Sequence, residues 1–94
     1  MKLLMLIVAE EKKEELEVLL SRAGAVGYTE IPREMGMGAT GPRLGSGAFP
    51  KTSAVLFTVV DDEKARSLAA DLKAYCEGCG ERLRMTSWAV EELL

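Results

Sequence analysis

A long glycine-rich segment separates two strand-like stretches near the middle of the 94-residue chain. It runs from Arg33 to Lys51 and contains five of the nine glycines. Connections in small domains usually span about 2–6 residues, and structureless ones beyond about 12–15 are mostly functional or disordered. Because glycine loses more backbone entropy on ordering than other residues, such a segment is costly for a small fold. We therefore expect it to carry the function.

The charge and composition of the chain exclude several classes of function. Its 12 Lys and Arg and 15 Asp and Glu give a net charge of −3, and no basic run is available to neutralise the phosphates of a nucleic acid. The apolar stretch Leu3–Ala9 is too short to span a bilayer and lacks a signal-peptide cleavage site, so we expect a cytoplasmic protein without direct membrane insertion. The chain has no histidine, the commonest general base, and no Ser-His-Asp or Cys-His set. We therefore expect no enzyme.

Four stretches have the apolar, β-branched composition of strands. They are Lys2–Ala9, Val26–Ile31, Ser53–Val60 and Arg82–Val90. Proline has no N–H for a ladder hydrogen bond, so Pro32 is expected to end the second strand.

Two helices are predicted in the intervals between these strands. The first opens on the acidic stretch Glu10–Glu15, whose charges favour the positive end of a helix, and the second is capped by Asp61 or Asp62. Glycines are expected to end both helices: Gly24 and Gly27 the first, Gly78 and Gly80 the second. Each helix has an apolar stripe at helical spacing: Leu16, Leu19, Leu20 and Ala23 in the first, and Ala65, Leu68, Ala69, Leu72 and Tyr75 or Cys76 in the second.

The resulting order of elements is βαββαβ. This order is typical of the ferredoxin-like fold, an α+β domain in which an antiparallel four-stranded sheet carries two helices on one face. We expect residues 1–94 to form one such domain, with residues 33–51 as a long loop between strands 2 and 3. The strands Lys2–Ala9 and Ser53–Val60 are apolar at consecutive positions, so the face without helices is too apolar for water. We infer that it is buried against other copies of the chain.

The run Gly36–Gly41 in the long loop is a literal G-x-G-x-x-G. A dinucleotide-binding Rossmann unit would need a helix after this run, whereas Pro42 and further glycines follow. Backbone N–H groups of glycine-rich turns can bind anions without a helix. Because Arg33, Arg43 and Lys51 lie in the same loop, the segment suits a phosphate or carboxylate. The alternative is a loop whose glycines serve only flexibility.

Cys76 and Cys79 form a C-x-x-C at the end of the second predicted helix. A closed zinc site needs four ligands and this pair offers two. Reactive cysteine pairs lie at the N-terminus of a helix, where the dipole lowers the thiol pKa, and this pair is at the opposite end. The favoured interpretation is one packed and one surface cysteine, both reduced; a redox or metal site is the alternative.

Three short motifs, in this order, resemble those of the P-II signal-transduction proteins, in particular a short P-II-like branch. Thr29–Ile31 is similar to the Thr-Glu-Val that ends the family's second strand. Gly36–Gly38 is similar to the Gly-Phe-Gly at the base of its T-loop. Val59–Asp62 is similar to the Val-Val-Asp-Asp that leads into its second helix. The resemblance covers nearly the whole chain.

The resemblance implies a homotrimer that takes part in nitrogen regulation. In the family the sheets face a three-fold axis, clefts between subunits bind adenine nucleotides, and the T-loop engages a membrane transporter or a metabolic enzyme. From the residues themselves, we expect the ligand contacts to be Gly36, Gly38 and Gly41 of the glycine-rich run, with Arg43 and Lys51 and with Arg82 or Arg84 as substitute phosphate contacts.

The chain also departs from the family pattern. Ala39 and Thr40 replace the Arg-Gln pair of the classical proteins, and the loop has no tyrosine as an acceptor for uridylylation. The stretch Cys76–Arg82 replaces the glycine- and lysine-rich phosphate loop. The alternative function is a metal- or redox-responsive protein that uses Cys76 and Cys79 and is similar to the divalent-cation-tolerance proteins, which share the trimeric fold.

Overall fold

The computed structural model describes residues 1–25, 27–38, 41–43, 45, 51–79 and 83–94. In chain order its elements are β1 (Lys2–Ala9), the 3-10 helix η1 (Glu10–Lys12), α1 (Lys13–Arg22), β2 (Thr29–Glu34), β3 (Gly36–Gly38), β4 (Gly41–Arg43), β5 (Ser53–Val60), α2 (Asp62–Cys79) and β6 (Arg84–Ala89).

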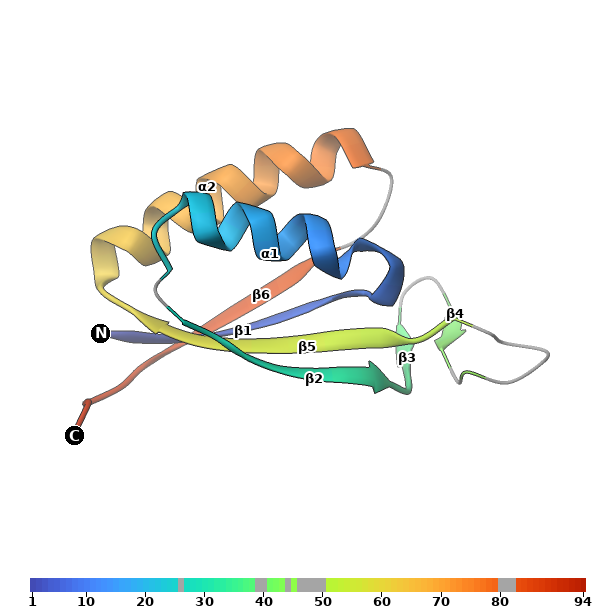
Figure 1. Ribbon diagram of the computed structural model, residues 1–94, viewed down its shortest axis with the longest axis horizontal. Coiled ribbons are helices and arrows are strands. Elements are labelled where there is room, and N and C mark those ends of the chain that lie inside the picture. The colour runs from blue at the N-terminus through green and yellow to red at the C-terminus, as the bar shows by residue number, and fades with distance from the viewer. Residues whose placement is uncertain (26, 39–40, 44, 46–50, 80–82) are drawn as a thin grey trace.

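Four strands form an antiparallel sheet in the order β2-β5-β1-β6. Both α-helices cover the same face of this sheet (Figure 1). This is the predicted ferredoxin-like α+β fold. The two further strands, β3 and β4, pair with each other in a small separate sheet that projects from one end of the domain (Figure 1).

The core lies between the sheet and the two helices because side chains along β1 and β5 are buried at alternate positions. In β5, Ala54, Leu56, Thr58 and Val60 are buried toward the helices, while the residues that alternate with them are more exposed. The largest fully buried side chains are leucines of both layers: Leu4, Leu6, Leu16, Leu20, Leu56 and Leu68. Burying each contributes about 1.5–3 kcal/mol, so these side chains account for the two-layer arrangement.

The face of the sheet that carries no helix is also apolar. By register, the residues on this face of the three strands β1, β5 and β6 include Leu3, Met5, Ile7, Val55, Phe57, Val59 and Trp88. Val59 remains 42% exposed and Trp88 45% exposed. We call this surface the open face.

The strand β2 differs from its prediction at both ends. It begins at Thr29 rather than Val26 and continues past Pro32 to Glu34, so the expectation that Pro32 ends it is wrong. The strand lies at the edge of the sheet and pairs only with β5, and an edge strand tolerates a missing N–H on its free side. Its register shifts between Ile31 and Glu34, which marks a bulge.

The helix α2 also differs in detail. Asp61 caps it, because its Oδ1 accepts a hydrogen bond from the Lys64 backbone N–H at 2.7 Å. The helix continues past Gly78 to Cys79, so Gly78 does not stop it; one glycine in a last turn costs only about 1 kcal/mol. Ala69, expected in the apolar stripe, is exposed because the stripe is narrower than predicted and is centred on Leu68 and Leu72.

The helix α1 ends in a glycine cap, as predicted for Gly24. The N–H of Gly24 donates to the Ser21 carbonyl at 3.1 Å, and the N–H of Ala25 donates to the Leu20 carbonyl at 3.0 Å. This pair of bonds is a Schellman motif, and Gly24 has the left-handed φ of 81° that the motif requires. Lys64 of α2 fixes the cap through a 2.8 Å hydrogen bond from Nζ to the Gly24 carbonyl.

The substitution Gly24→Ala is expected to lower the free energy of unfolding by roughly 1–2 kcal/mol, because a Cβ disfavours the left-handed conformation. The measurement is urea unfolding at one protein concentration. Gly27→Ala is the control, because a Cβ there would meet no atom within 4 Å and Gly27 has no positive φ. Equal stability of the two variants would contradict the assigned role of Gly24.

Candidate functional site

The elements that carry the predicted ligand residues meet at one end of the sheet. Figure 1 shows the β3–β4 hairpin, the start of α1 and the C-terminal end of α2 at this end, opposite the two chain termini. Glu34 of β2 lies opposite Ser53 of β5 there, and Arg84 of β6 lies opposite Ile7 of β1. We call this region the loop end of the sheet.

The glycine-rich run forms a β-hairpin that the sequence did not predict. Gly36 pairs with Arg43, Met37 with Pro42 and Gly38 with Gly41. The exclusion of a Rossmann unit is confirmed, since a strand and not a helix follows the run. Residues 39–40 lie outside the described residues.

No feature of the fold requires glycine at position 36. A Cβ added to Gly36 would meet no atom within 4 Å, and Gly36 does not have a positive φ. A glycine without a steric or conformational reason is consistent with close approach of another molecule to the backbone.

The remaining predicted contacts differ in where they lie. Lys51 is exposed, and its carbonyl accepts a hydrogen bond from the Gly45 N–H at 3.3 Å. Arg84 is exposed at the start of β6. Arg82 and the side chain of Arg43 lie outside the described part of the chain.

One chain does not bring all these residues to one ligand. The strands β2 and β6 are the two edges of the sheet, with β5 and β1 between them. Three strand spacings of about 4.8 Å separate the edges by roughly 14 Å. Gly36, which follows β2, and Arg84 of β6 therefore belong to different sides of the loop end.

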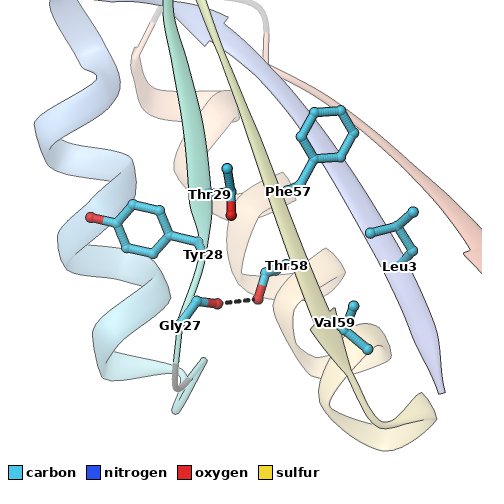
Figure 2. A pocket seen from close by; sticks show the side chains of 7 residues that line it. All are labelled: Leu3, Gly27, Tyr28, Thr29, Phe57, Thr58 and Val59. Atoms are coloured by element: carbon cyan, nitrogen blue, oxygen red, sulfur yellow. Dashed lines mark hydrogen bonds between the residues drawn. The ribbon is translucent and has the colours of Figure 1, made fainter. Parts of the chain in front are cut away.

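A hollow of about 320 Å³ opens elsewhere, on the open face where β5 runs past the start of β2. Its lining is Leu3, Gly27, Tyr28, Thr29, Phe57, Thr58 and Val59 (Figure 2). The Thr58 hydroxyl donates to the Gly27 carbonyl at 2.6 Å and holds this segment against β5. Aromatic and aliphatic walls with a few polar groups suit a small flat ligand.

Sequence reasoning missed this hollow because its residues come from three separate segments. The available signal was Gly27, which was interpreted only as a helix terminator. A Cβ at Gly27 would meet nothing within 4 Å, so the fold does not require glycine there either.

A comparison with family models matches residues 1–87 of the chain to the family described as nitrogen regulatory protein P-II. The chain belongs to the P-II family. This confirms the resemblance inferred from Thr29–Ile31, Gly36–Gly38 and Val59–Asp62. No curated protein matches the chain by sequence.

Solved structures of P-II-like proteins share the fold. One is CPII, a nitrogen regulatory PII-like protein from Thiomonas intermedia, bound to ADP, AMP and bicarbonate: it is 24% identical with a TM-score of 0.75, over 95% of this chain and 86% of that chain. Another is a PII-like signalling protein from Thermus thermophilus, 20% identical with a TM-score of 0.70, over 93% of this chain and 83% of that chain. None of the described helices of this P-II chain is long and apolar enough to cross a bilayer.

The cysteine pair of this P-II chain lies at the C-terminal end of α2, as predicted. Cys76 is half-buried, and the side chain of Cys79 is outside the described residues. Within the described ranges, no three His, Cys, Asp or Glu residues form a group that could hold a metal ion.

An ionic cluster lies between α1 and β2 beside the loop end. Lys13 Nζ is 3.4 Å from both Glu10 Oε1 and Glu30 Oε2. These contacts, led by the hydrogen bond with Glu10, raise the pKa of Lys13 although burial opposes them. Glu30 faces the helices beside the buried Leu56, its partner in the register.

A second acidic residue, Glu17, interacts with the Glu30 carboxylate. Glu30 Oε1 is buried and has no hydrogen-bond partner. Burial, followed by the hydrogen bond and the negative charge of Glu30, raises the pKa of Glu17. A raised pKa is the expected result when two carboxylates lie close enough to share one proton. Burial, followed by the charges of Glu17 and Glu30, also raises the pKa of Tyr28.

The raised pKa of Glu17 predicts a pH dependence of stability. Its folded pKa lies above the ordinary value of 4.5, so its contribution is fully present below pH 4.5 and is lost as the pH rises through the folded pKa. In Glu17→Gln this loss is expected to disappear. Urea unfolding between pH 4 and pH 8, at one protein concentration, measures it.

The control for this experiment is Glu92→Gln, which removes the same charge from the exposed C-terminal tail. It should keep the wild-type pH profile. Identical profiles for Glu17→Gln and wild type would refute the shared proton.

Proposed function

We propose that this P-II protein is a non-enzymatic, cytoplasmic signalling trimer. In this proposal it binds an adenine nucleotide in clefts between subunits and regulates a membrane transporter or a metabolic enzyme through the long loop. The observation that carries the proposal is that CPII, which has the same fold, is bound to ADP, AMP and bicarbonate.

The open face supports assembly of several copies. It presents a nearly continuous apolar surface across three strands, including Leu3, Phe57 and Trp88. Contiguous apolar surfaces of this kind mark interfaces in soluble proteins. The two edges of one sheet differ, so a contact between unlike edges of neighbouring copies forms a ring where the rotation closes. Three copies around such an axis would bury their open faces together.

A site between copies also accounts for the separation of the candidate binding groups. Within one chain the hollow at Thr29 and the glycine at position 36 are seven residues apart along an extended segment, or roughly 20 Å. The base and phosphates of one nucleotide do not span that distance. A neighbouring copy that places its hollow beside the loop end would bring the two halves together.

The hollow suits the base of a nucleotide, and the loop end suits its phosphates. The walls of the hollow offer Phe57 and Leu3 for contact with a flat base. The loop end offers backbone N–H groups of glycines and the cations Arg43 and Lys51 for phosphates. We assign Gly36, Gly38, Gly41, Arg43, Lys51, Arg82 and Arg84 as candidate contacts on this basis.

Signalling would follow from a population shift. A ligand at the loop end that binds one conformation of the loop more tightly raises the population of that conformation. The partner then responds to the loop and needs no contact with the ligand.

Wild-type protein is expected to sediment as a trimer at micromolar concentration, and Val59→Lys is expected to dissociate it, because the charge would enter the interface. Val18→Lys on α1 is the matched control, since Val18 is exposed to a similar degree, 51% against 42%. It should remain trimeric. Analytical ultracentrifugation measures the oligomeric state of each protein. A monomeric wild type would reject the proposed assembly.

Isothermal titration with ATP, ADP and AMP, with and without bicarbonate, tests the ligand. At least one nucleotide is expected to bind. Absence of heat from all of them, in protein confirmed as a trimer, would reject nucleotide binding.

Two glycine variants separate the two halves of the site. Gly36→Ala and Gly27→Val are each expected to weaken binding by about tenfold or more, as overpacking of about 1–3 kcal/mol implies. Both should unfold like wild type, because their surroundings are open. Unchanged affinity in one variant would remove that half from the site.

A further inference from the structure

The start of the long loop is held in an unusual backbone conformation. Arg33 has a φ of 57° and, among the described residues, is the one residue other than glycine with a positive φ. An L-residue is disfavoured in this conformation by a factor of roughly five to thirty. Local contacts must therefore compensate.

Arg33 lies on the segment that connects the sheet to the β3–β4 hairpin, so its conformation affects the path of the chain there. It lies within the register shift between Ile31 and Glu34, immediately before the β3–β4 hairpin. A change in the φ of Arg33 would therefore redirect the chain that leads into the β3–β4 hairpin, which projects from this end of the sheet (Figure 1).

Glu10 supplies the compensating contact. The Arg33 N–H donates to Glu10 Oε2 at 3.0 Å. The backbone N–H of Glu10 also donates to the Thr52 carbonyl at 3.1 Å. One residue of η1 therefore binds both ends of the long loop.

Lys13 holds the Glu10 carboxylate in place. Its ammonium lies between Glu10 and Glu30, and the three side chains are only 27%, 26% and 21% exposed. Partly buried pairs are less screened by water than surface pairs. Because Glu30 belongs to β2, the cluster ties η1, α1 and β2 together at the base of the loop.

We propose that Glu10, oriented by Lys13 and Glu30, is a latch that keeps Arg33 left-handed and so sets the direction of the β3–β4 hairpin. With the latch closed, the hairpin projects as observed. With it open, Arg33 relaxes to an extended φ and the hairpin changes direction. The inference concerns the regulation of the loop and rests on the proposed function for its biological purpose.

The latch is tested by amide hydrogen exchange of residues 33–38 in ligand-free protein, followed by NMR. Glu10→Ala is expected to raise exchange by roughly tenfold, as loss of a charge-assisted hydrogen bond implies. Glu10→Gln, which keeps an acceptor oxygen, should raise it less. Exchange in Glu10→Ala within twofold of wild type would overturn the proposal.

A second comparison isolates the strain at Arg33. Arg33→Gly and Arg33→Ala both remove the charge, but only glycine relieves the disfavoured φ. Adding Glu10→Ala should raise exchange strongly in the Arg33→Ala background and much less in the Arg33→Gly background. Equal effects in the two backgrounds would show that Glu10 does not act through the φ of Arg33, and would also overturn the proposal.

The exchange experiment contains no nucleotide, so the two proposals can fail separately. Expected exchange results without nucleotide binding would leave the latch in place and remove the ligand. Nucleotide binding without an effect of Glu10→Ala on hydrogen exchange would reject the latch and keep the proposed ligand.

Discussion

The central strands β1 and β5 are apolar on both faces, whereas two short helices can cover only one. This mismatch shapes the rest of the molecule. The covered face takes the buried leucines and fixes the two-layer fold. The other face keeps Val59 and Trp88 about half exposed in the single chain. An isolated monomer would leave this surface in water, which supports the proposed association of several copies.

Most of the fold could be predicted from the sequence because side-chain periodicity specifies it. Leu16 and Leu20 at helical spacing, and alternate burial in Ser53–Val60, have few other solutions. The prediction failed where the pattern of side chains does not determine the backbone structure. Pro32 is tolerated because β2 is an edge strand. The β3–β4 hairpin consists of glycine, methionine, proline and arginine, residues of low or moderate strand preference, and is held by backbone pairing.

The candidate site was predictable only in part, for a similar reason. The long loop is visible in the sequence as a run of glycines and cations. The hollow forms where β2 no longer pairs with β5. The hydrogen bond from the Thr58 hydroxyl to the Gly27 carbonyl holds the chain in place there. The latch depends on a contact between Glu10 and Arg33, which are 23 residues apart. Neither local propensity nor spacing indicates such contacts.

The four glycines of this P-II chain whose surroundings the structure describes divide into two kinds. Gly24 and Gly45 have positive φ values of 81° and 65°, so the backbone itself requires them. Gly27 and Gly36 have neither a positive φ nor a neighbour within 4 Å of an added Cβ. Folding gives no reason for them, although glycine is entropically costly. Gly27 lies at the hollow and Gly36 at the hairpin, the two places proposed to contact the ligand. A requirement for bare backbone facing open space at both places is what a ligand shared between neighbouring copies would impose.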